Sequence, residues 1–276
     1  MVNLPAGYPF PVTKGTMSPN YSAGSFRPEG IIIHFTAGYS AESSANWMRN
    51  PASKASAHFV VGKMGEIIQL VDLDKKAWHA GSSVWKDKSG ASSYTFGIEV
   101  DNIGPLTLSG GKMVNVYGKP YEGSVVAARI ATNSKDDEKV RYYAPYTTAQ
   151  FESVRKLCDY LCSNFGINPL AIMGHEHVAP ARKVDPGPAW SWHLIDDMAG
   201  AYYDPFLLQH YLSVLGQNIG EIDGLVGKKT MAGLFDLSQG MATLHGRSVL
   251  DGTFDLNNKE QAVNVIKQLR NLRPQL

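Results

Sequence analysis

The chain has very few cysteines and no long apolar run. Cys158 and Cys162 are the only two cysteines among its 276 residues, so the sequence predicts no disulfide framework. They lie four positions apart in a segment expected to be helical, where both side chains would share one face and pack as small core residues. No stretch reaches the ~18 apolar residues that a membrane-spanning helix needs, and we therefore expect no membrane insertion.

The chain also has no marked excess of positive or negative charge. The chain has 26 Lys and Arg against 25 Asp and Glu, a formal net charge of +1. Bulk electrostatics thus give no reason to expect nucleic acid or an anionic membrane as a partner. The first ten residues have neither a basic start nor an apolar run, so the sequence predicts a protein made in the cytoplasm without a signal peptide. Nothing in the composition indicates an oligomeric state.

What the sequence does contain is enough apolar material for a large core, since 43% of its residues are hydrophobic. An irregular lead-in at residues 1–29 precedes a series of apolar runs typical of strands and two segments typical of helices. The predicted strands are 30–35, 57–61, 66–71, 94–100 and 170–173, and the predicted helices are 41–48 and 148–165. This succession favours an α/β, or mixed α+β, domain at residues 30–200.

Two regions depart from this pattern. Residues 102–146 lack clear periodicity and are rich in glycine, which predicts a long, partly ordered insertion that forms a surface flap. Beyond residue 205 the pattern becomes helical, with an amphipathic segment at 206–216, a turn and a new helix start at 222–230, and a further helix at 259–272. These segments predict a small three-helix module at residues 205–276.

Two distant segments offer side chains that suit a metal ion. His34 ends the apolar run at 30–35, and His175 and Asp185 lie in a second polar stretch. Two imidazoles and one carboxylate leave the fourth position of a tetrahedral zinc open for water, which is the composition of a catalytic site. Lys183 precedes Asp185 by two residues and would face the same way on an extended segment, where it could stabilise an oxyanion.

Each of these residues also has a plainer explanation. A single histidine such as His34 is more often a buried, hydrogen-bonded core residue, and Asp185 before a proline is more often a turn residue. The spacing is not a compact zinc motif of the HExxH kind. From the chemistry of the residues alone, a zinc site and a structural role both remain open.

A family resemblance favours the zinc site. Five stretches occur in a fixed order: Ile33-His34-Phe35-Thr36-Ala37-Gly38, Ser56-Ala57-His58-Phe59, Ala77-Trp78-His79-Ala80-Gly81, Phe96-Gly97-Ile98-Glu99, and Gly174-His175 followed by Arg182-Lys183-Val184-Asp185-Pro186-Gly187-Pro188. Through them the chain, over roughly residues 28–198, resembles the family-2 N-acetylmuramoyl-L-alanine amidases, which share their fold with the peptidoglycan-recognition proteins. The resemblance implies a central twisted, mixed β-sheet with flanking helices.

The resemblance also implies roles for five residues. His34, His175 and Asp185 match the ligands of one Zn²⁺ ion. Glu99 matches the general base, and Lys183 matches the cation that stabilises the tetrahedral intermediate. The implied reaction is hydrolysis of the amide between the lactyl group of N-acetylmuramic acid and L-alanine, with peptidoglycan or its muropeptides as the partner.

Four further residues are expected to contact substrate. Trp78 and His79 lie in a motif that borders the family's substrate groove, although Trp78 could equally be a core residue. His177 is a tempting extra metal ligand, but the resemblance assigns that role to the preceding histidine, so we expect His177 to support or line the groove. Lys54 lies where relatives can hold a cation that faces the carboxylate of the stem peptide.

The C-terminal segment resembles a three-helix peptidoglycan-binding domain. Its matching features are Leu208-Gln209, the Asp223-Gly224 turn, and Gly227 with Thr230 at a helix start. Residues 236–240 depart from the usual aromatic-glutamine ending, so a module that packs without binding is the alternative. A linked binding module would raise the local concentration of an insoluble polymer around the catalytic domain.

Competing functions remain at this point. A non-catalytic peptidoglycan-recognition protein is the main alternative, and a zinc peptidase that cuts within the stem peptide is another. For the biological setting, the expected absence of a signal peptide favours a phage endolysin released through a holin, or an antibacterial effector delivered by a secretion system. A cytosolic recycling enzyme is less favoured, because it would need no wall-binding module.

Overall fold

The structure is a computed structural model that describes residues 7–130, 139–196, 198, 202–245 and 255–272. A six-stranded sheet with the order β1-β5-β4-β9-β3-β14 lies at its centre. Four neighbouring strands are parallel and β5 is antiparallel to β4, so the sheet is mixed as predicted. The strands are Thr13–Lys14 (β1), Gly30–Phe35 (β3), Phe59–Val61 (β4), Ile67–Gln69 (β5), Thr95–Val100 (β9) and Ile172–Gly174 (β14), and the helices of this domain are Ala41–Arg49 (α1), Thr148–Phe165 (α2) and His193–Asp196 (α3).

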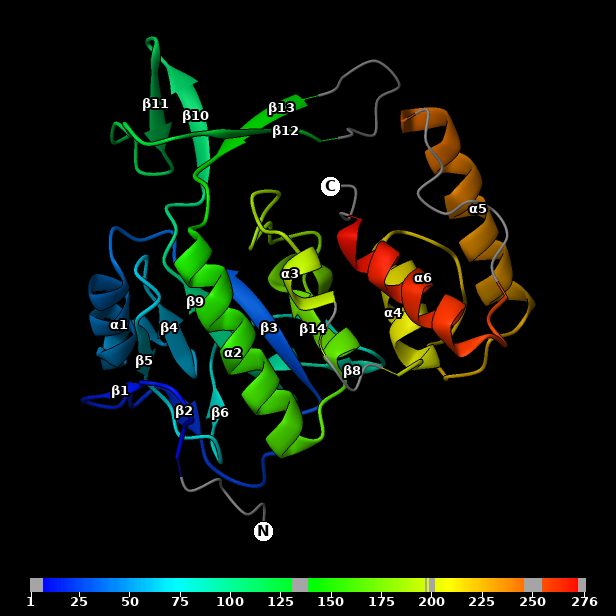
Figure 1. Cartoon of the computed structure of the whole chain (residues 1–276), viewed down its shortest axis with the longest axis horizontal. Coiled ribbons are helices and arrows are strands. Elements are labelled where there is room, and N and C mark those ends of the chain that lie inside the picture. Colours follow the sequence, from blue (N-terminus) through cyan, green and yellow to red (C-terminus); the bar gives the residue numbers. More distant parts are fainter. Residues whose placement is uncertain (1–6, 131–138, 197, 199–201, 246–254, 273–276) are drawn as a thin grey trace.

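Helices cover both faces of the sheet (Figure 1). Alternate residues of a strand point to opposite faces, and β4 follows this rule. Phe59 and Val61 share a core cluster with Val154 of α2, whereas the intervening Val60 belongs to a second cluster with Ala45 of α1. The predicted continuous apolar strand, β3, is therefore fully buried between layers over residues 31–33.

Local signals place the helix ends. The Ser40 hydroxyl accepts a hydrogen bond from the backbone of Ser43, and that of Thr147 accepts one from Gln150, so α1 and α2 both begin with a capping box. α2 ends at Gly166, whose φ of 66° suits a residue without a Cβ. Both predicted helices are thus confirmed, together with their termini.

Parallel pairing aligns three strand ends. In the register between β3 and β9, His34 lies opposite Glu99. In the register between β3 and β14, Gly174 lies opposite Ile33, so His175 follows at the level of His34. Because the strands are parallel, their carboxyl ends meet at one edge of the sheet, where ligands bind in open α/β sheets.

The insertion forms a second sheet in its described part. Residues 102–146 contain a four-stranded antiparallel sheet with the order β11-β10-β13-β12, which stands at the top of Figure 1, beyond the carboxyl edge of the main sheet. In β10 only Leu106 is buried, and its alternating stretch, Leu106 to Ser109, is only four residues long, too short to mark a strand clearly in the sequence. Most of the charged run that the sequence has at residues 135–139 lies outside the described residues. The strands are Pro105–Ser109 (β10), Lys112–Asn115 (β11), Val126–Ile130 (β12) and Lys139–Tyr143 (β13).

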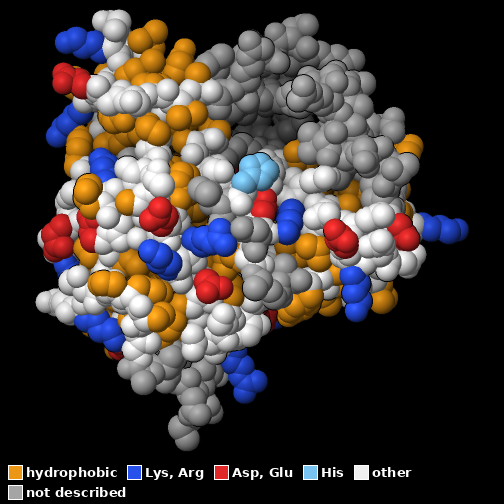
Figure 2. Space-filling view, in the orientation of Figure 1, with side chains coloured by type: hydrophobic (Ala, Val, Ile, Leu, Met, Phe, Trp, Pro, Cys, Tyr) orange, Lys and Arg blue, Asp and Glu red, His pale blue; other side chains and the backbone are white. Residues whose placement is uncertain are grey.

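The lead-in is tied to the main sheet rather than free of it. β1 pairs in parallel with β5, and the Tyr8 hydroxyl donates a hydrogen bond to Gln69 (3.0 Å). Short two-residue strands complete the periphery: Tyr21–Ser22 (β2) with Lys76–Ala77 (β6), and Val84–Trp85 (β7) with Lys88–Ser89 (β8). Charges of both signs are interspersed on the face seen in Figure 2. Within the described chain, no helix combines the length and apolar character required to cross a membrane.

The three predicted C-terminal helices are Pro205–Val214 (α4), Lys228–His245 (α5) and Lys259–Asn271 (α6). They lie together beside the sheet domain in Figure 1. Gln209, only 1% exposed, holds the turn after α4, because its Nε2 donates to Asp223 Oδ1 (2.9 Å) and its Oε1 accepts from the backbone of Gly224 (2.7 Å). The leucine-glutamine and aspartate-glycine features therefore hold the fold of the module together.

α6 is joined to the sheet domain through one buried guanidinium. Arg270 is 1% exposed, and its Nη1 donates to the carbonyls of Pro169 and Ile172 (3.0 Å each), while Nη2 bonds the carboxylate of Asp196. Ile172 opens β14, the strand that leads to His175. Apolar side chains of α4 and α6 also belong to the same core cluster as β3 and β14. The module and the sheet domain thus share one core.

We predict that Arg270→Ala lowers the free energy of unfolding by about 3 kcal/mol, because it removes the buried donor that serves two carbonyls and the ion pair with Asp196. Urea denaturation followed by circular dichroism measures this change. Asn264→Ala, at an exposed position of the same helix, is the matched control and should change stability by no more than about 0.5 kcal/mol. Equal, small effects of both substitutions would contradict the shared core.

Candidate active site

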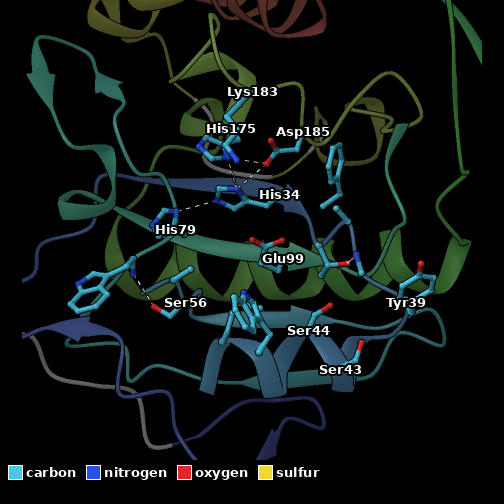
Figure 3. A pocket seen from close by; sticks show the side chains of 18 of the residues that line it. His34, Tyr39, Ser43, Ser44, Ser56, His79, Glu99, His175, Lys183 and Asp185 are labelled. Carbon is cyan, nitrogen blue, oxygen red and sulfur yellow. Dashed lines mark hydrogen bonds and ion pairs between the residues drawn. The ribbon is translucent and has the colours of Figure 1, made fainter. Parts of the chain in front are cut away.

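Three potential metal ligands converge at the carboxyl edge of the sheet. His34 Nδ1 lies 2.9 Å from His175 Nδ1, and each of these nitrogens lies 3.0 Å from Asp185 Oδ2. All three residues are at most 5% exposed. Among the described residues, they form a group of histidine and carboxylate side chains that could hold one metal ion (Figure 3).

Backbone packing brings Asp185 to the two histidines. His175 opens a 3-10 turn, His175–His177, directly after β14. The Glu176 backbone donates a hydrogen bond to the Asp185 carbonyl (3.0 Å). A Cβ on Gly174 would lie 2.5 Å from Pro186 Cδ, so only glycine lets the segment after Asp185 approach β14 this closely.

The protonation of these groups follows from their surroundings. Burial, reinforced by the neighbouring His175, lowers the pKa of His34 to about 4, so its ring is neutral near pH 7. Burial alone would raise the pKa of Asp185, but the two imidazole rings beside it, those of His175 and His34, hold it well below its usual range. His34 therefore offers a neutral imidazole and Asp185 an ionised carboxylate, the forms that bind metal ions.

A contact at Nε2, the ring nitrogen that points away from His34 and Asp185, orients the side chain of His175. Its Nε2 lies 3.0 Å from the carbonyl of Ala80, which also accepts a hydrogen bond from Arg182 (2.7 Å). Arg182 also donates a hydrogen bond to the Ser82 carbonyl (2.8 Å), so it holds the backbone segment that contains Ala80 and Ser82 in place. Arg182 belongs to the fifth sequence motif, but the sequence did not predict a role for it, because its partners are backbone carbonyls and a motif of side chains does not identify them.

Glu99 stands beside His34 at the end of β9. Its side chain lines the pocket, yet its Oε2 is buried and has no hydrogen-bond partner within the described chain. Burial raises the pKa of Glu99 well above its usual value, and the negative Asp185 adds to this effect. A carboxylate with raised proton affinity that faces a cavity is suited to accept and return a proton.

These groups line one cavity of about 520 Å³. Lys183 and Asp185 lie on its upper side in Figure 3, Glu99 lies at its centre, and Ser43 and Ser44 of α1 lie below. Trp78 lines the same cavity, is 39% exposed, and donates from its indole to Ser22 Oγ (2.8 Å). The indole is therefore accessible at the pocket rather than enclosed in the core.

The insertion contributes an aromatic wall. Tyr117, in the turn after β11, lines the cavity and is 64% exposed. Its ring centroid lies 6.5 Å from that of Tyr39, and Lys119 Nζ lies 5.1 Å from the Tyr39 ring. Asn115 holds this turn, because its Oδ1 accepts from the backbones of Tyr117 and Lys119 and its Nδ2 donates to the Tyr39 hydroxyl (3.0 Å each). Sequence reasoning missed this wall, because the insertion shows no periodicity.

The remaining predicted residues lie at different distances from the cavity. His79 lines it but is only 9% exposed and contacts His34. His177 does not line it, because the segment forms a 3-10 turn rather than an extended strand; its Nδ1 accepts from the Gly174 backbone (2.9 Å) and its ring packs near Trp192. Lys54 is exposed and precedes the lining residues without being one of them, so its contact with substrate stays a prediction.

Sequence comparison places this site in a known family. The profile of a family described as N-acetylmuramoyl-L-alanine amidase matches residues 24–188, which is more than half of the chain. The chain belongs to this amidase family. The resemblance predicted from the five motifs is thereby confirmed, and all the predicted site residues fall within the matched segment.

Individual relatives carry the same family name. N-acetylmuramoyl-L-alanine amidase AmiD of Escherichia coli (strain K12) is 28% identical over 192 residues, which cover 66% of this chain and 58% of AmiD. 1,6-anhydro-N-acetylmuramyl-L-alanine amidase AmpD of Citrobacter freundii is 26% identical over 139 residues, which cover 50% of this chain and 54% of AmpD. The chain spans little more than half the length of these curated relatives.

A solved structure matches the fold. AmiD from E. coli, in complex with the substrate anhydro-N-acetylmuramic acid-L-Ala-D-gamma-Glu-L-Lys, superposes with a TM-score of 0.52 at 22% identity and covers 90% of each chain. Because residues 1–204 make up less than 90% of this chain, the likeness extends into the C-terminal helices. The predicted mixed fold of this domain is confirmed.

Proposed function

We propose that the protein is a zinc-dependent peptidoglycan hydrolase that cleaves the amide between N-acetylmuramic acid and the L-alanine of the stem peptide. The observation that supports this most strongly is the convergence of His34, His175 and Asp185 beside Glu99 in one pocket of a family member. The names of AmiD and AmpD describe the same bond.

The donor set fits zinc. The three ligand atoms lie 2.9–3.0 Å apart, slightly less than the ~3.3 Å expected for tetrahedral ligands at zinc bond lengths of about 2.0 Å. A bound cation would relieve the repulsion between their converging lone pairs. When bound, zinc would lower the pKa of a water molecule and polarise a substrate carbonyl.

Glu99 and Lys183 supply the remaining chemistry in this proposal. Glu99 accepts a proton from the attacking water and returns it to the nitrogen of the departing L-alanine. Its raised pKa makes the carboxylate a stronger base than an ordinary glutamate, which suits it to take up the proton. Lys183 lines the same pocket and places a positive charge near the oxygen on which negative charge develops.

The shape of the pocket supports a substrate with both sugar and peptide parts. Exposed aromatic faces stand at two places in its lining, Trp78 on one side and Tyr39 with Tyr117 on the other. Aromatic faces stack on apolar faces of ligands, while the polar groups between them orient the ligand. A complete ligand set with Glu99 and Lys183 in the same lining favours hydrolysis over recognition alone.

The setting that we propose is lysis of a bacterial cell wall, by a phage endolysin or by an antibacterial effector. The C-terminal helices would keep the enzyme on the insoluble polymer. Since Gln209 and Asp223 hold the fold of that module, wall binding would depend on its other surface residues. A holin gene beside the coding sequence would favour the endolysin, and an immunity gene would favour the effector.

Digestion of purified sacculi tests the proposed reaction. We expect free stem peptides that begin with L-alanine, identified by mass spectrometry, and we expect a chelator to stop their release and added zinc to restore it. Products cut within the stem peptide would instead indicate a peptidase. Sedimentation of the zinc-loaded protein with sacculi, without any cleavage, would indicate a recognition protein.

Glu99→Gln keeps the shape of the side chain and removes its basicity. We predict a 10²–10⁴-fold loss (order of magnitude) in kcat on a soluble muropeptide, with zinc content unchanged, because the lost function is proton transfer. Atomic absorption measures the metal. The exposed Glu152→Gln on α2 serves as the control and should retain full activity. A Glu99→Gln rate close to that of the wild type would remove Glu99 from the mechanism.

Tyr117→Ala tests the aromatic wall. Loss of one stacking face should raise KM for a disaccharide-peptide about 5-fold and leave kcat nearly unchanged, because the ring contacts bound substrate and takes no part in proton transfer. Val116→Ala is the matched control, since Val116 is 58% exposed and does not line the pocket. Equal KM values for the two variants would show that the insertion does not contact substrate.

A further inference from the structure

His79 lies between a metal ligand and a backbone carbonyl. Its Nδ1 is 3.1 Å from His34 Nε2, and its own Nε2 is 3.1 Å from the carbonyl oxygen of Thr95. The rings of His34 and His79 meet edge to face, with centroids 5.2 Å apart and an interplanar angle of 81°. His79 is only 9% exposed, so water has little access to this chain of contacts.

The proton positions along this chain follow from the carbonyl at its end. A carbonyl oxygen only accepts hydrogen bonds, so His79 Nε2 must carry the proton. Nδ1 of the same ring faces a second buried imidazole, where an additional proton would place an uncompensated charge, so Nδ1 is an acceptor. His34 Nε2 must then donate to His79, which leaves the lone pair of His34 Nδ1 directed at the metal site.

The proton position of His175, the second histidine ligand, follows in the same way from Ala80, the residue after His79. His175 Nε2 lies 3.0 Å from the carbonyl oxygen of Ala80, so it donates, and the lone pair of His175 Nδ1 also faces the metal site. Two neighbouring residues, His79 through its side chain and Ala80 through its carbonyl, therefore contact the outer nitrogens of both histidine ligands.

We propose that His79 is a positioning residue that holds His34 in its Nε2-protonated tautomer, so that the His79–Ala80 pair selects the ligating nitrogen of both histidines. This inference rests on the proposed metal site and adds to it the origin of its ligand orientation. It gives His79 a place behind the metal ligands, whereas the motif alone suggested contact with substrate.

The surroundings of His79 hold its ring in place. A Cβ on Gly97 would lie 2.5 Å from His79 Cγ, so the glycine at this position of β9 makes room for the ring. The Gly97 backbone in turn donates to Nδ1 of His58 (3.0 Å), whose Nε2 contacts the Lys75 carbonyl (3.0 Å). The histidine and glycine residues of three separate motifs thus form one packed group behind His34.

Nitrogen-15 NMR of the zinc-free wild-type protein tests the inference without any substitution. The shifts of His34 and His175 should both correspond to the tautomer that carries its proton on Nε2. A His34 ring that is protonated on Nδ1, or that exchanges equally between tautomers, would overturn the proposal. This measurement does not depend on activity, so it stands apart from the test of the amidase reaction.

Zinc affinity, measured by competition with a chromophoric chelator, provides the second test. His79→Ala should weaken zinc binding about 10–100-fold, the range typical for loss of an outer hydrogen-bond partner of a ligand. His79→Asn keeps an acceptor near the position of Nδ1 and should restore most of the affinity. The His34 tautomer should follow the same order in NMR spectra of the three proteins.

His210→Ala is the matched control, because it also removes a buried, neutral histidine, but one on α4 whose ring packs near Trp85 and Tyr211. It should bind zinc as tightly as the wild type. Equal losses in His210→Ala and His79→Ala, or unchanged affinity in folded His79→Ala, would overturn the positioning role. Tautomers and affinities as expected in a protein that fails to release stem peptides would refute only the proposed reaction.

Discussion

The parallel pairing of β3 with β9 on one side and β14 on the other determines where the chemistry of this protein takes place. The register between these strands sets His34 opposite Glu99 and brings His175 to the same level. A slip of one residue in either pair would turn one of these side chains to the other face of the sheet. The buried Ile31–Ile33 segment of β3 opposes such a slip, because its apolar side chains occupy the core on both faces.

The rest of the molecule supports this edge from two directions. Arg270 of α6 bonds the backbone that opens β14, so the C-terminal helices stabilise the strand that leads to His175. The turn after β11 adds Tyr117 to the wall of the pocket. The C-terminal module thus supports a strand of the site, and the insertion contributes a residue to its lining.

The sequence predicted the features that depend on local pattern or on motif. The strand ending at His34, the capped helices and the family were all accessible in this way. The placement of His177 was not, because the 3-10 turn that carries it has no clear signal in the sequence. The contacts of His79 and Arg270 could not be predicted either, since their partners are mostly backbone carbonyls brought near by tertiary packing. Every residue has a backbone carbonyl, so the sequence does not show which of them a side chain will contact. The second sheet escaped prediction because its strands are short and any alternating stretch in them spans no more than about four residues.

The most direct test of the account is anomalous diffraction at the zinc edge from crystals of the zinc-loaded protein. The account predicts one strong peak about 2.0–2.2 Å from His34 Nδ1, His175 Nδ1 and a carboxylate oxygen of Asp185. A metal ion bound through Nε2 of either histidine, or one ligated by His177 in place of His175, would contradict it. So would zinc-loaded protein in which this edge of the sheet holds no metal at all.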